Sequence, residues 1–197
     1  QGYLAASQPG GVLNDDGYLL TGDVGHLNED GLLKVSGRSK DVIIRSGHNI
    51  DPAVIEQCAS KFDGVADCAA VAMPDAVAGD VPALFVVPRK NSQLDVEALQ
   101  AHLRAQISEP QALPAHVAVV EALPLISVGK VSRVELRRIA AEQALNSALG
   151  DSDGRKLIKV EVRNTGTLRA YVDPEMEPDL PVGGPSAADI IARFALS

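Results

Sequence analysis

The sequence contains no tryptophan, and aromatic residues make up only 3% of its 197 residues. Because 46% of the residues are hydrophobic, we expect the core to be built from Ala, Val, Leu and Ile. No apolar run approaches the roughly 20 residues that a membrane-spanning helix needs, and no secretory leader is visible. We expect the chain, which opens at Gln1 in the middle of a pattern, to be a piece of a longer protein.

Cysteine is also scarce. The two cysteines, Cys58 and Cys68, are too few for a disulfide framework or a four-cysteine zinc site, and we expect them to be buried reduced thiols. The four histidines are scattered without metal-ligand spacing, and no serine lies in the Gly-x-Ser-x-Gly context of a hydrolase nucleophile. The sequence therefore predicts no metal site made by its own residues.

Basic residues are outnumbered by acidic ones, 18 to 26, which gives a net charge of −8. An acidic surface repels a phosphate backbone, so nucleic-acid binding is not expected. A local basic cluster can nevertheless hold a small phosphate-bearing ligand, because the local field there overrides the global one.

The pattern along the chain changes near residues 37–41, which we interpret as the boundary between two units. Before it, extended runs at 18–20 and 32–35, each preceded by an Asp-Gly turn, predict a small β-hairpin assembly. After it, alternating strands and helices predict a compact α/β (α+β) unit of roughly 110 residues. The predicted strands of its three-stranded sheet are 65–72, 83–87 and 117–120, after a short β-branched run at 42–44; the flanking helices open at Asp51-Pro52, span 95–107 and span 131–145.

Two finer expectations accompany this outline. On the first helix, Val54, Ile55, Cys58 and Ala59 share one face, which predicts that this face is buried. Near the C-terminal end, a further hairpin over 157–172 and a short helix near 187–194 are predicted.

The first segment that could carry chemistry is Thr21-Gly22-Asp23-Val24-Gly25. A carboxylate on a glycine-flanked turn can accept two hydrogen bonds from a ribose diol. An aspartate that only caps its own turn explains the same pattern, so Asp23 alone decides nothing.

The second segment runs from Gly37 to Gly47 and places three cations, Arg38, Lys40 and Arg45, close together. Arg38 and Lys40 would share one face of a strand and could neutralise a phosphate. A charged edge that prevents strand pairing is the alternative. A glycine at position 47 could allow a ligand to approach the backbone closely, or it could simply belong to an ordinary turn.

The third segment, Leu123 to Arg133, places Lys130 directly after a glycine in an apolar loop that leads into a helix. Lysine is a compact, mobile cation suited to bridging an oxyanion and a phosphate oxygen. The segment is not a Walker-type phosphate loop, because Pro124 stands where the first glycine of that motif would be. A solvent-exposed lysine at the start of a helix is the alternative.

In this order and spacing, the three segments resemble the adenylate-forming (ANL) superfamily, most closely its acyl-CoA synthetase branch. The segment Gly17-Tyr18-Leu19-Leu20-Thr21-Gly22-Asp23 looks like the Trp/Tyr-x-x-Thr-Gly-Asp motif of that family. Residues 37–52, which include Ser-Gly-His-Asn-Ile-Asp-Pro, look like its hinge motif, and residues 124–130 look like its C-terminal lysine motif. The resemblance covers residues 15–145.

The resemblance implies a role for each matched position. Asp23 would bind the ribose hydroxyls of ATP or AMP, and Arg38 would contact the ribose or phosphate. Lys40 would be the hinge about which a small C-terminal domain swings; some members of the family carry aspartate there. Ser46 and Gly47 would line the tunnel for the pantetheine arm of CoA. Lys130 would stabilise charge while a carboxylate attacks the α-phosphate of ATP.

The implied activity is AMP-forming acid–CoA ligation of a fatty or aryl carboxylic acid, with ATP, CoA and Mg²⁺. Residues 1–39 would end the N-terminal AMP-binding domain, and 40–148 would be the mobile C-terminal domain. Residues 149–197 would be an extension, for which packing on the small domain and dimerisation are both open. Because the phosphate loop, adenine pocket and acyl pocket belong to the absent N-terminal domain, the fragment alone is expected to be inactive.

Two alternatives remain at this point. One is an adenylation domain that loads the pantetheine of a carrier protein; the absence of an Asp-Ser-Leu attachment context in residues 151–197 favours CoA. The other is a small α/β interaction module without nucleotide chemistry. For the ligase we expect a cytoplasmic location, because ATP and CoA are supplied there.

Overall fold

The computed structural model describes residues 13–149, 158–163, 167–172 and 187–194 of the chain. By internal contacts the chain divides into two compact units, residues 1–40 and residues 41–197. Each unit is described by itself below. In the part of the chain that the structure describes, no helix is long and apolar enough to cross a bilayer.

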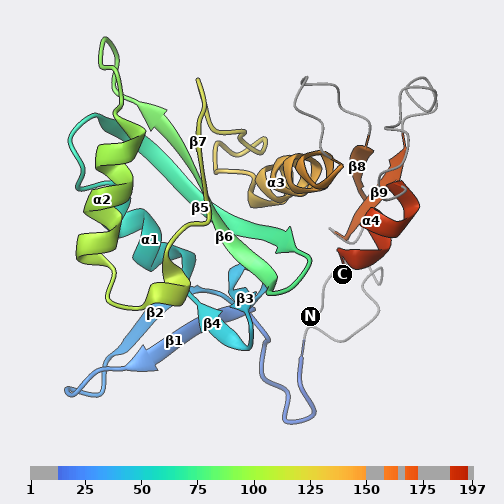
Figure 1. Ribbon diagram of the computed structural model, residues 1–197. Helices are drawn as coiled ribbons and strands as arrows, with labels where there is room; N and C mark the ends of the chain where they lie inside the picture. Colours follow the sequence, from blue (N-terminus) through green and yellow to red (C-terminus); the bar gives the residue numbers. More distant parts are fainter. Residues whose placement is uncertain (1–12, 150–157, 164–166, 173–186, 195–197) are drawn as a thin grey trace. The chain divides into compact units, whose positions relative to one another are not determined.

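The first unit contains one antiparallel hairpin, formed by β1 (Asp23–Leu27) and β2 (Leu33–Arg38) (Figure 1). The expected extended run at 32–35 is confirmed, but the run at 18–20 is not a strand and contributes only a bridge between Leu13 and Leu19. Thr21 and Gly22 separate this bridge from β1, so the antiparallel pairing with β2 starts at Asp23 and not within 18–20.

Both Asp-Gly turns of the first unit are present and share one geometry. In the first, Gly17 N donates to Asn14 O, and the Asn14 side chain accepts from Tyr18 N. Asn28 and Gly31 repeat these roles in the turn between β1 and β2. The two glycines have φ values of 82° and 76°, a left-handed conformation that glycine adopts without steric cost.

The second unit is built on a five-stranded sheet, not the predicted three-stranded one. Its strands are β3 (Ile43–Arg45), β4 (His48–Ile50), β5 (Val65–Asp75), β6 (Gly79–Pro88) and β7 (His116–Val119). The order is β4-β3-β6-β5, and β7 pairs in parallel with β6 while the other neighbours are antiparallel. The prediction missed β4 because the hairpin β3–β4 is too short to show alternation.

The end of one predicted strand also differs. Strand β5 continues through Met73 and Pro74 to Asp75, although the predicted strand ended at residue 72. A proline without an N–H is tolerated there because β5 is an edge strand of this sheet.

Helices cover both faces of this sheet (Figure 1). On one face lie α1 (Pro52–Ala59) and α2 (Val96–Gln106), and on the other lies α3 (Arg133–Ala148). Successive residues of the central strands point to opposite faces. Leu84 and Val86 therefore pack with α1 and α2, whereas Ala83 and Phe85 pack with α3. Two short 3₁₀ turns, Ser39–Asp41 and Pro110–Ala112, complete the connections.

The expected start of the first helix is confirmed in detail. Asp51 is the N-cap, its side chain accepts from Ala53 N at 2.9 Å, and Pro52 is the first helical residue. Ile55 is fully buried, but Val54 is 47% exposed, so the prediction that it faces the core is wrong. The helix is only two turns long, and the sheet covers a narrower stripe of it than the pattern suggested.

The C-terminal elements β8 (Ile158–Val162), β9 (Leu168–Val172) and α4 (Ala187–Arg193) pack against α3 within the second unit (Figure 1). The Asn146 amide of α3 joins them to the helix: its Nδ2 donates to Ile158 O at 2.8 Å, and its Oδ1 accepts from Ile158 N at 2.9 Å. One side chain thus pairs with both backbone groups of a strand residue, as a neighbouring strand would.

The two cysteines are only partly buried and are not joined to each other. Burial, with the nearby carboxylates of Glu56 and Asp67, raises the pKa of the Cys68 thiol to about 12. This thiol is therefore protonated at neutral pH and has little nucleophilic character.

Candidate functional site

The structure brings Asp23 and Arg38 together in the first unit. They are opposite residues of the β1–β2 ladder, and Arg38 Nε lies 3.4 Å from Asp23 Oδ1. The backbone N–H of Asp23 donates to the Thr21 hydroxyl oxygen at 3.1 Å. The two side chains are 69% (Arg38) and 35% (Asp23) exposed, so the pair presents a cation and a double hydrogen-bond acceptor to solvent.

Lys40 lies in the 3₁₀ turn Ser39–Asp41, where the first unit ends and the second begins. Its side chain is exposed. The turn is fastened to the first unit on its N-terminal side, because both the backbone N–H and the hydroxyl of Ser39 donate to Gly22 O, at 2.8 and 3.1 Å.

Ser46 and Gly47 form the two-residue turn between β3 and β4. Both have positive φ, 48° and 84°, as a type I′ hairpin turn requires. Ser46 N donates to Ala78 O at 2.8 Å, and Ala78 N donates to the Asp75 carboxylate at 2.8 Å. The turn between β5 and β6 thereby supports the exposed Ser46–Gly47 turn.

Lys130 follows a tight turn formed by residues 126–129. Gly129 N donates to Ile126 O, and Ile126 N donates to Lys130 O, both at 2.8 Å. Gly129 has a φ of 77°, so the loop is a type I turn closed by a left-handed glycine, a common hairpin connection. A bridge between Leu125 and Val131 and the bond from Ser132 N to Pro124 O at 2.7 Å complete its stem.

The turn presents Lys130 among exposed apolar side chains. Leu125 is 61% exposed, Ile126 47% and Val128 71%. The Lys130 side chain is itself exposed and has no hydrogen-bond or ion-pair partner among the residues that the structure describes. An unpaired ammonium on a projecting apolar loop is free to approach an anionic group that lies outside this unit.

A charged cluster that the sequence analysis missed lies next to this loop. Arg133 forms a two-pronged ion pair with Glu56, with Nη1–Oε1 at 2.8 Å and Nη2–Oε2 at 3.0 Å, and Nη1 also donates to Ala70 O at 2.7 Å. Arg133 Nε lies 3.5 Å from Asp41 Oδ2. Nothing local indicates the pairing, because Glu56 and Arg133 are 77 positions apart.

Burial and charge act in opposite directions on the pKa of Arg133. Partial burial lowers it, but the hydrogen bonds and charge of Glu56, with smaller contributions from Asp41 and Asp51, outweigh burial and hold the pKa above its ordinary value. The guanidinium is therefore permanently charged and firmly paired.

The predicted site residues fall into separate groups. Asp23 and Arg38 belong to the first unit, whereas the Ser46–Gly47 turn and the Lys130 loop belong to the second. No hydrogen bond or ion pair among the described residues joins that turn to that loop. Within the described ranges, no group of three or more His, Cys, Asp or Glu residues could hold a metal ion.

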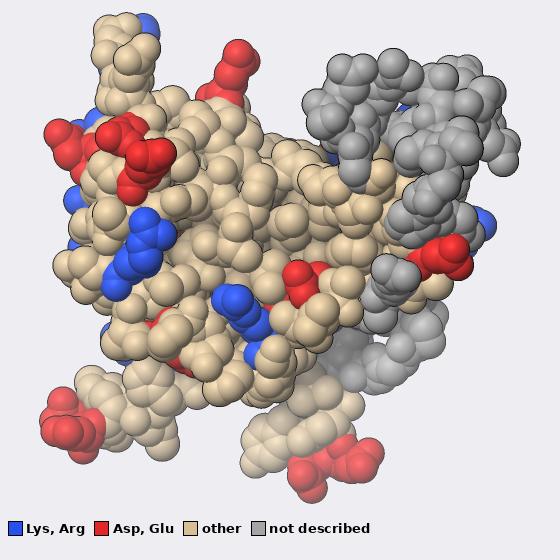
Figure 2. Space-filling model, in the orientation of Figure 1, with Lys and Arg blue, Asp and Glu red and all other residues tan. Residues whose placement is uncertain are grey.

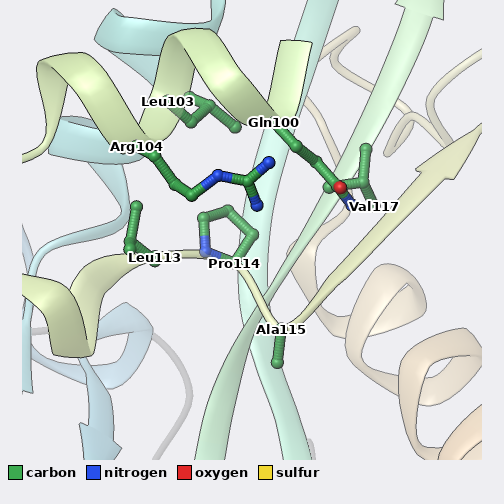
Figure 3. Close-up of a pocket in the computed structure, with 7 residues that line it drawn as sticks. All are labelled: Gln100, Leu103, Arg104, Leu113, Pro114, Ala115 and Val117. Carbon is green, nitrogen blue, oxygen red and sulfur yellow. The ribbon is translucent and has the colours of Figure 1, made fainter. Parts of the chain in front are cut away.

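A shallow pocket of about 230 Å³ lies elsewhere, between α2 and the start of β7. Figure 3 shows Arg104 reaching from α2 toward its centre, near Leu103 and Pro114. None of the predicted site residues lines it. On the face drawn in Figure 2, the Lys and Arg side chains of the described residues are scattered among other residues and form no broad basic surface.

Comparisons with known proteins agree with the motif assignment. Residues 54–130 match the family described as AMP-binding enzyme C-terminal domain. The marinolic acid–CoA ligase of Pseudoalteromonas sp. (strain SANK 73390) is 39% identical over 157 residues, which cover 78% of this chain and 24% of that protein. The long-chain-fatty-acid–CoA ligase of Bacillus subtilis is 31% identical over 146 residues, 74% of this chain and 25% of that protein.

A solved structure supports the same conclusion. ATP-bound MatB from Rhodopseudomonas palustris matches with a TM-score of 0.63 and 30% identity, over 67% of this chain and 26% of that one. The chain thus spans about a quarter of the length of the proteins it matches.

The fold and these matches define the class: a mixed α/β domain of the type that ends the AMP-binding enzymes. The chain belongs to the adenylate-forming (ANL) superfamily and corresponds to the C-terminal region of the acyl-CoA ligases that it matches.

Proposed function

We propose that this chain is the C-terminal part of an AMP-forming acid–CoA ligase whose second unit turns about Lys40 between two half-reactions. The observation that carries the proposal is the unpaired Lys130, which projects on an apolar loop from a domain homologous to those of acyl-CoA ligases. The acid, fatty or aryl, is selected by residues outside this chain.

In the first half-reaction, a carboxylate oxygen attacks the α-phosphorus of ATP, and the bond to pyrophosphate breaks. Negative charge gathers on the α-phosphate oxygens, and the Lys130 ammonium is suited to stabilise it. In the second, the CoA sulfur attacks the carbonyl of the acyl-AMP, the thiol proton leaves, and AMP departs. The two steps need different groups at one centre, which a rotation of the second unit supplies.

The geometry of the first unit fits a nucleotide. The Asp23 carboxylate has an oxygen free of its contact with Arg38 and can accept from both hydroxyls of a ribose, while Arg38 can turn to a phosphate. Mg²⁺ would be held with ATP by the N-terminal domain, since the described residues offer no metal cluster of their own.

The first unit also fits the end of a larger domain. Apolar residues along its hairpin are largely exposed: Leu27 is 68% exposed, Leu33 70% and Val35 58%. A lone two-stranded hairpin is marginally stable in water, so this unit is expected to complete the enzyme's own N-terminal domain. The fragment without that domain is therefore proposed to be inactive, and the complete ligase to act in the cytoplasm.

Two thiol acceptors are candidates for the second half-reaction, free CoA and a pantetheine bound to a carrier protein. The names of two similar proteins, a 2,3-dihydroxybenzoate-AMP ligase of Bacillus subtilis (34% identical) and the amide bond synthetase McbA of Marinactinospora thermotolerans (32%), do not mention CoA. An AMP-forming relative can therefore carry a name without CoA, and a carrier-bound pantetheine stays the second candidate acceptor. Comparing free CoA with pantetheinylated carrier protein as acceptor, each with preformed acyl-AMP, distinguishes the two.

The test of the proposal is Lys130→Ala in the complete enzyme. We expect acid-dependent exchange of pyrophosphate into ATP to fall by about 100-fold or more, because one well-placed electrostatic group is lost. Thioester formation from preformed acyl-AMP should stay within about twofold. Lys34→Ala, which removes an exposed lysine of β2, is the matched control and should alter neither half-reaction. Equal losses in both half-reactions would disprove the role of Lys130.

A further inference from the structure

The Arg133 cluster, formed by Asp41, Glu56, Ala70 and Arg133, joins four separate parts of the second unit. Glu56 lies on α1, Ala70 on β5, Arg133 is the first residue of α3, and Asp41 ends the 3₁₀ turn that contains Lys40. The side chains of Arg133, Glu56 and Asp41 are only 28%, 21% and 28% exposed. Ion pairs that are shielded in this way are screened less by salt than surface pairs.

The bonds of the cluster close on one another. Arg133 donates to both Glu56 oxygens and to Ala70 O, and Glu56 Oε1 accepts in turn from Ala70 N at 2.8 Å. The carboxylate and the backbone of β5 therefore hold the guanidinium in one orientation, and only a planar fork of donors satisfies all three acceptors.

This cluster is the nearest charged anchor to Lys130 along the chain, and Val131 between them packs against the core. Arg133 stands three residues after Lys130, and Ser132 between them is bonded to Pro124 and caps α3. The turn itself projects into solvent, with Leu125 and Val128 exposed. Its position relative to the sheet and to the hinge therefore depends on residues 131–133, where the loop joins α3 and Arg133 is paired.

We propose that Arg133 is a positioning residue for adenylation: its paired contacts with Glu56, Ala70 and Asp41 hold the Lys130 loop in place relative to the sheet and the hinge. This inference rests on the proposed function of Lys130. Without the paired contacts of the Arg133 guanidinium, the Lys130 loop can shift. A displacement of about 1 Å in a catalytic group costs up to roughly 100-fold in rate.

The Ser46–Gly47 turn does not depend on the cluster. It is held by the bond from Ser46 N to Ala78 O, and Arg45 beside it donates to Gln111 O at 3.0 Å. Arg133 takes part in neither bond. A change at Arg133 should therefore affect the half-reaction that uses Lys130 and spare the one assigned to this turn.

The experiment compares Arg133→Gln, Arg133→Lys and Arg138→Gln in the complete ligase. Arg138 is the matched control, because it lies on the same helix, is 25% exposed and pairs with Glu135 and Glu142 without contacting α1 or the hinge turn. We expect Arg133→Gln to lower pyrophosphate exchange by about 10- to 100-fold and to leave thioester formation from acyl-AMP within about twofold. Arg133→Lys should recover part of the loss, and Arg138→Gln should change neither half-reaction by more than about twofold.

Hydrogen exchange supplies a readout that a general loss of stability would not give. The Ser132 amide, bonded to Pro124 O, should exchange faster in Arg133→Gln, while the Ser46 amide, bonded to Ala78 O, should exchange as in the wild type. If Arg133→Gln does not fold, Glu56→Gln, which keeps the shape of the side chain and removes its charge, is measured in the same way.

Two results overturn the inference: equal losses in both half-reactions, which mark a merely structural role, or no loss of pyrophosphate exchange. Lys130→Ala, measured in parallel, separates this inference from the proposed function. If Lys130→Ala impairs exchange and Arg133→Gln does not, only the positioning role fails. If Lys130→Ala has no effect, the proposed function fails first, and the positioning role fails with it.

Discussion

Gly47 offers a sharp test of the CoA tunnel that the family resemblance implies, because the structure separates strain from obstruction at this position. A Cβ added to Gly47 would meet nothing within 4 Å, so the Cβ of Gly47→Leu lies in open space. Its φ of 84° is unfavourable for leucine, at a cost of about 1–2 kcal/mol. For a domain of this size, that cost lowers the Tm by roughly 2–8 °C.

The expected effect on catalysis is larger than this strain explains. A folded protein with about 5–15 kcal/mol of stability remains folded after losing 1–2 kcal/mol. If a leucine at the turn obstructs the pantetheine arm, thioester formation from acyl-AMP falls by roughly 100-fold or more. Pyrophosphate exchange, which needs no thiol, should stay within about twofold.

Gly31→Leu is the control for strain. Gly31 has a φ of 76° and also has open space around its Cβ position, but it lies in the turn between β1 and β2. Both variants should lose similar stability in thermal unfolding, and only Gly47→Leu should lose CoA use. A thioester step that survives in Gly47→Leu, or an equal loss in both variants, would refute the reasoning.

Two further predictions concern stability. Asn146→Ala removes the amide that pairs with both backbone groups of Ile158. We expect the free energy of unfolding, measured with denaturant, to fall by about 1–3 kcal/mol, whereas Gln143→Ala on the exposed side of α3 should cost little. Equal effects of the two changes would show that the amide does not fasten the C-terminal hairpin. Backbone N–H groups of Ala78 and Val77 lower the pKa of the Asp75 carboxyl, so its stabilising effect is present above the ordinary aspartate pKa and is lost as the pH falls through its lowered value. Asp75→Asn should therefore weaken the loss of stability in acid, measured by unfolding at stepped pH, and an unchanged pH profile would contradict this.

The features that the sequence predicted correctly are those made by residues close together in the chain. The Asp51 cap uses an N–H two residues away, and the turns at Gly17 and Gly31 close over four residues. Their geometry follows from glycine's access to positive φ and from the reach of a short polar side chain. The two Asp-Gly turns, the run at 32–35 and the helices of the second unit were therefore visible without a structure, whereas β1 (Asp23–Leu27) was not.

The features that were missed depend on pairing between distant segments. Strand β4 and the narrow buried stripe on α1 follow from how the layers stack, which no local pattern encodes, and so does the docking of β8 on α3, which the sequence left open. The same holds for the pair of Glu56 and Arg133, since a glutamate and an arginine in two polar contexts look like ordinary surface residues until the fold brings them together.

The sequence by itself thus determined the family and the turns and singled out Lys130 as a candidate, because motifs and local hydrogen bonds are properties of neighbouring residues. Only the tertiary structure decided what holds that lysine's loop. Shielding from water makes a charged pair strong, and which side chains are shielded together is decided when helices pack on a sheet.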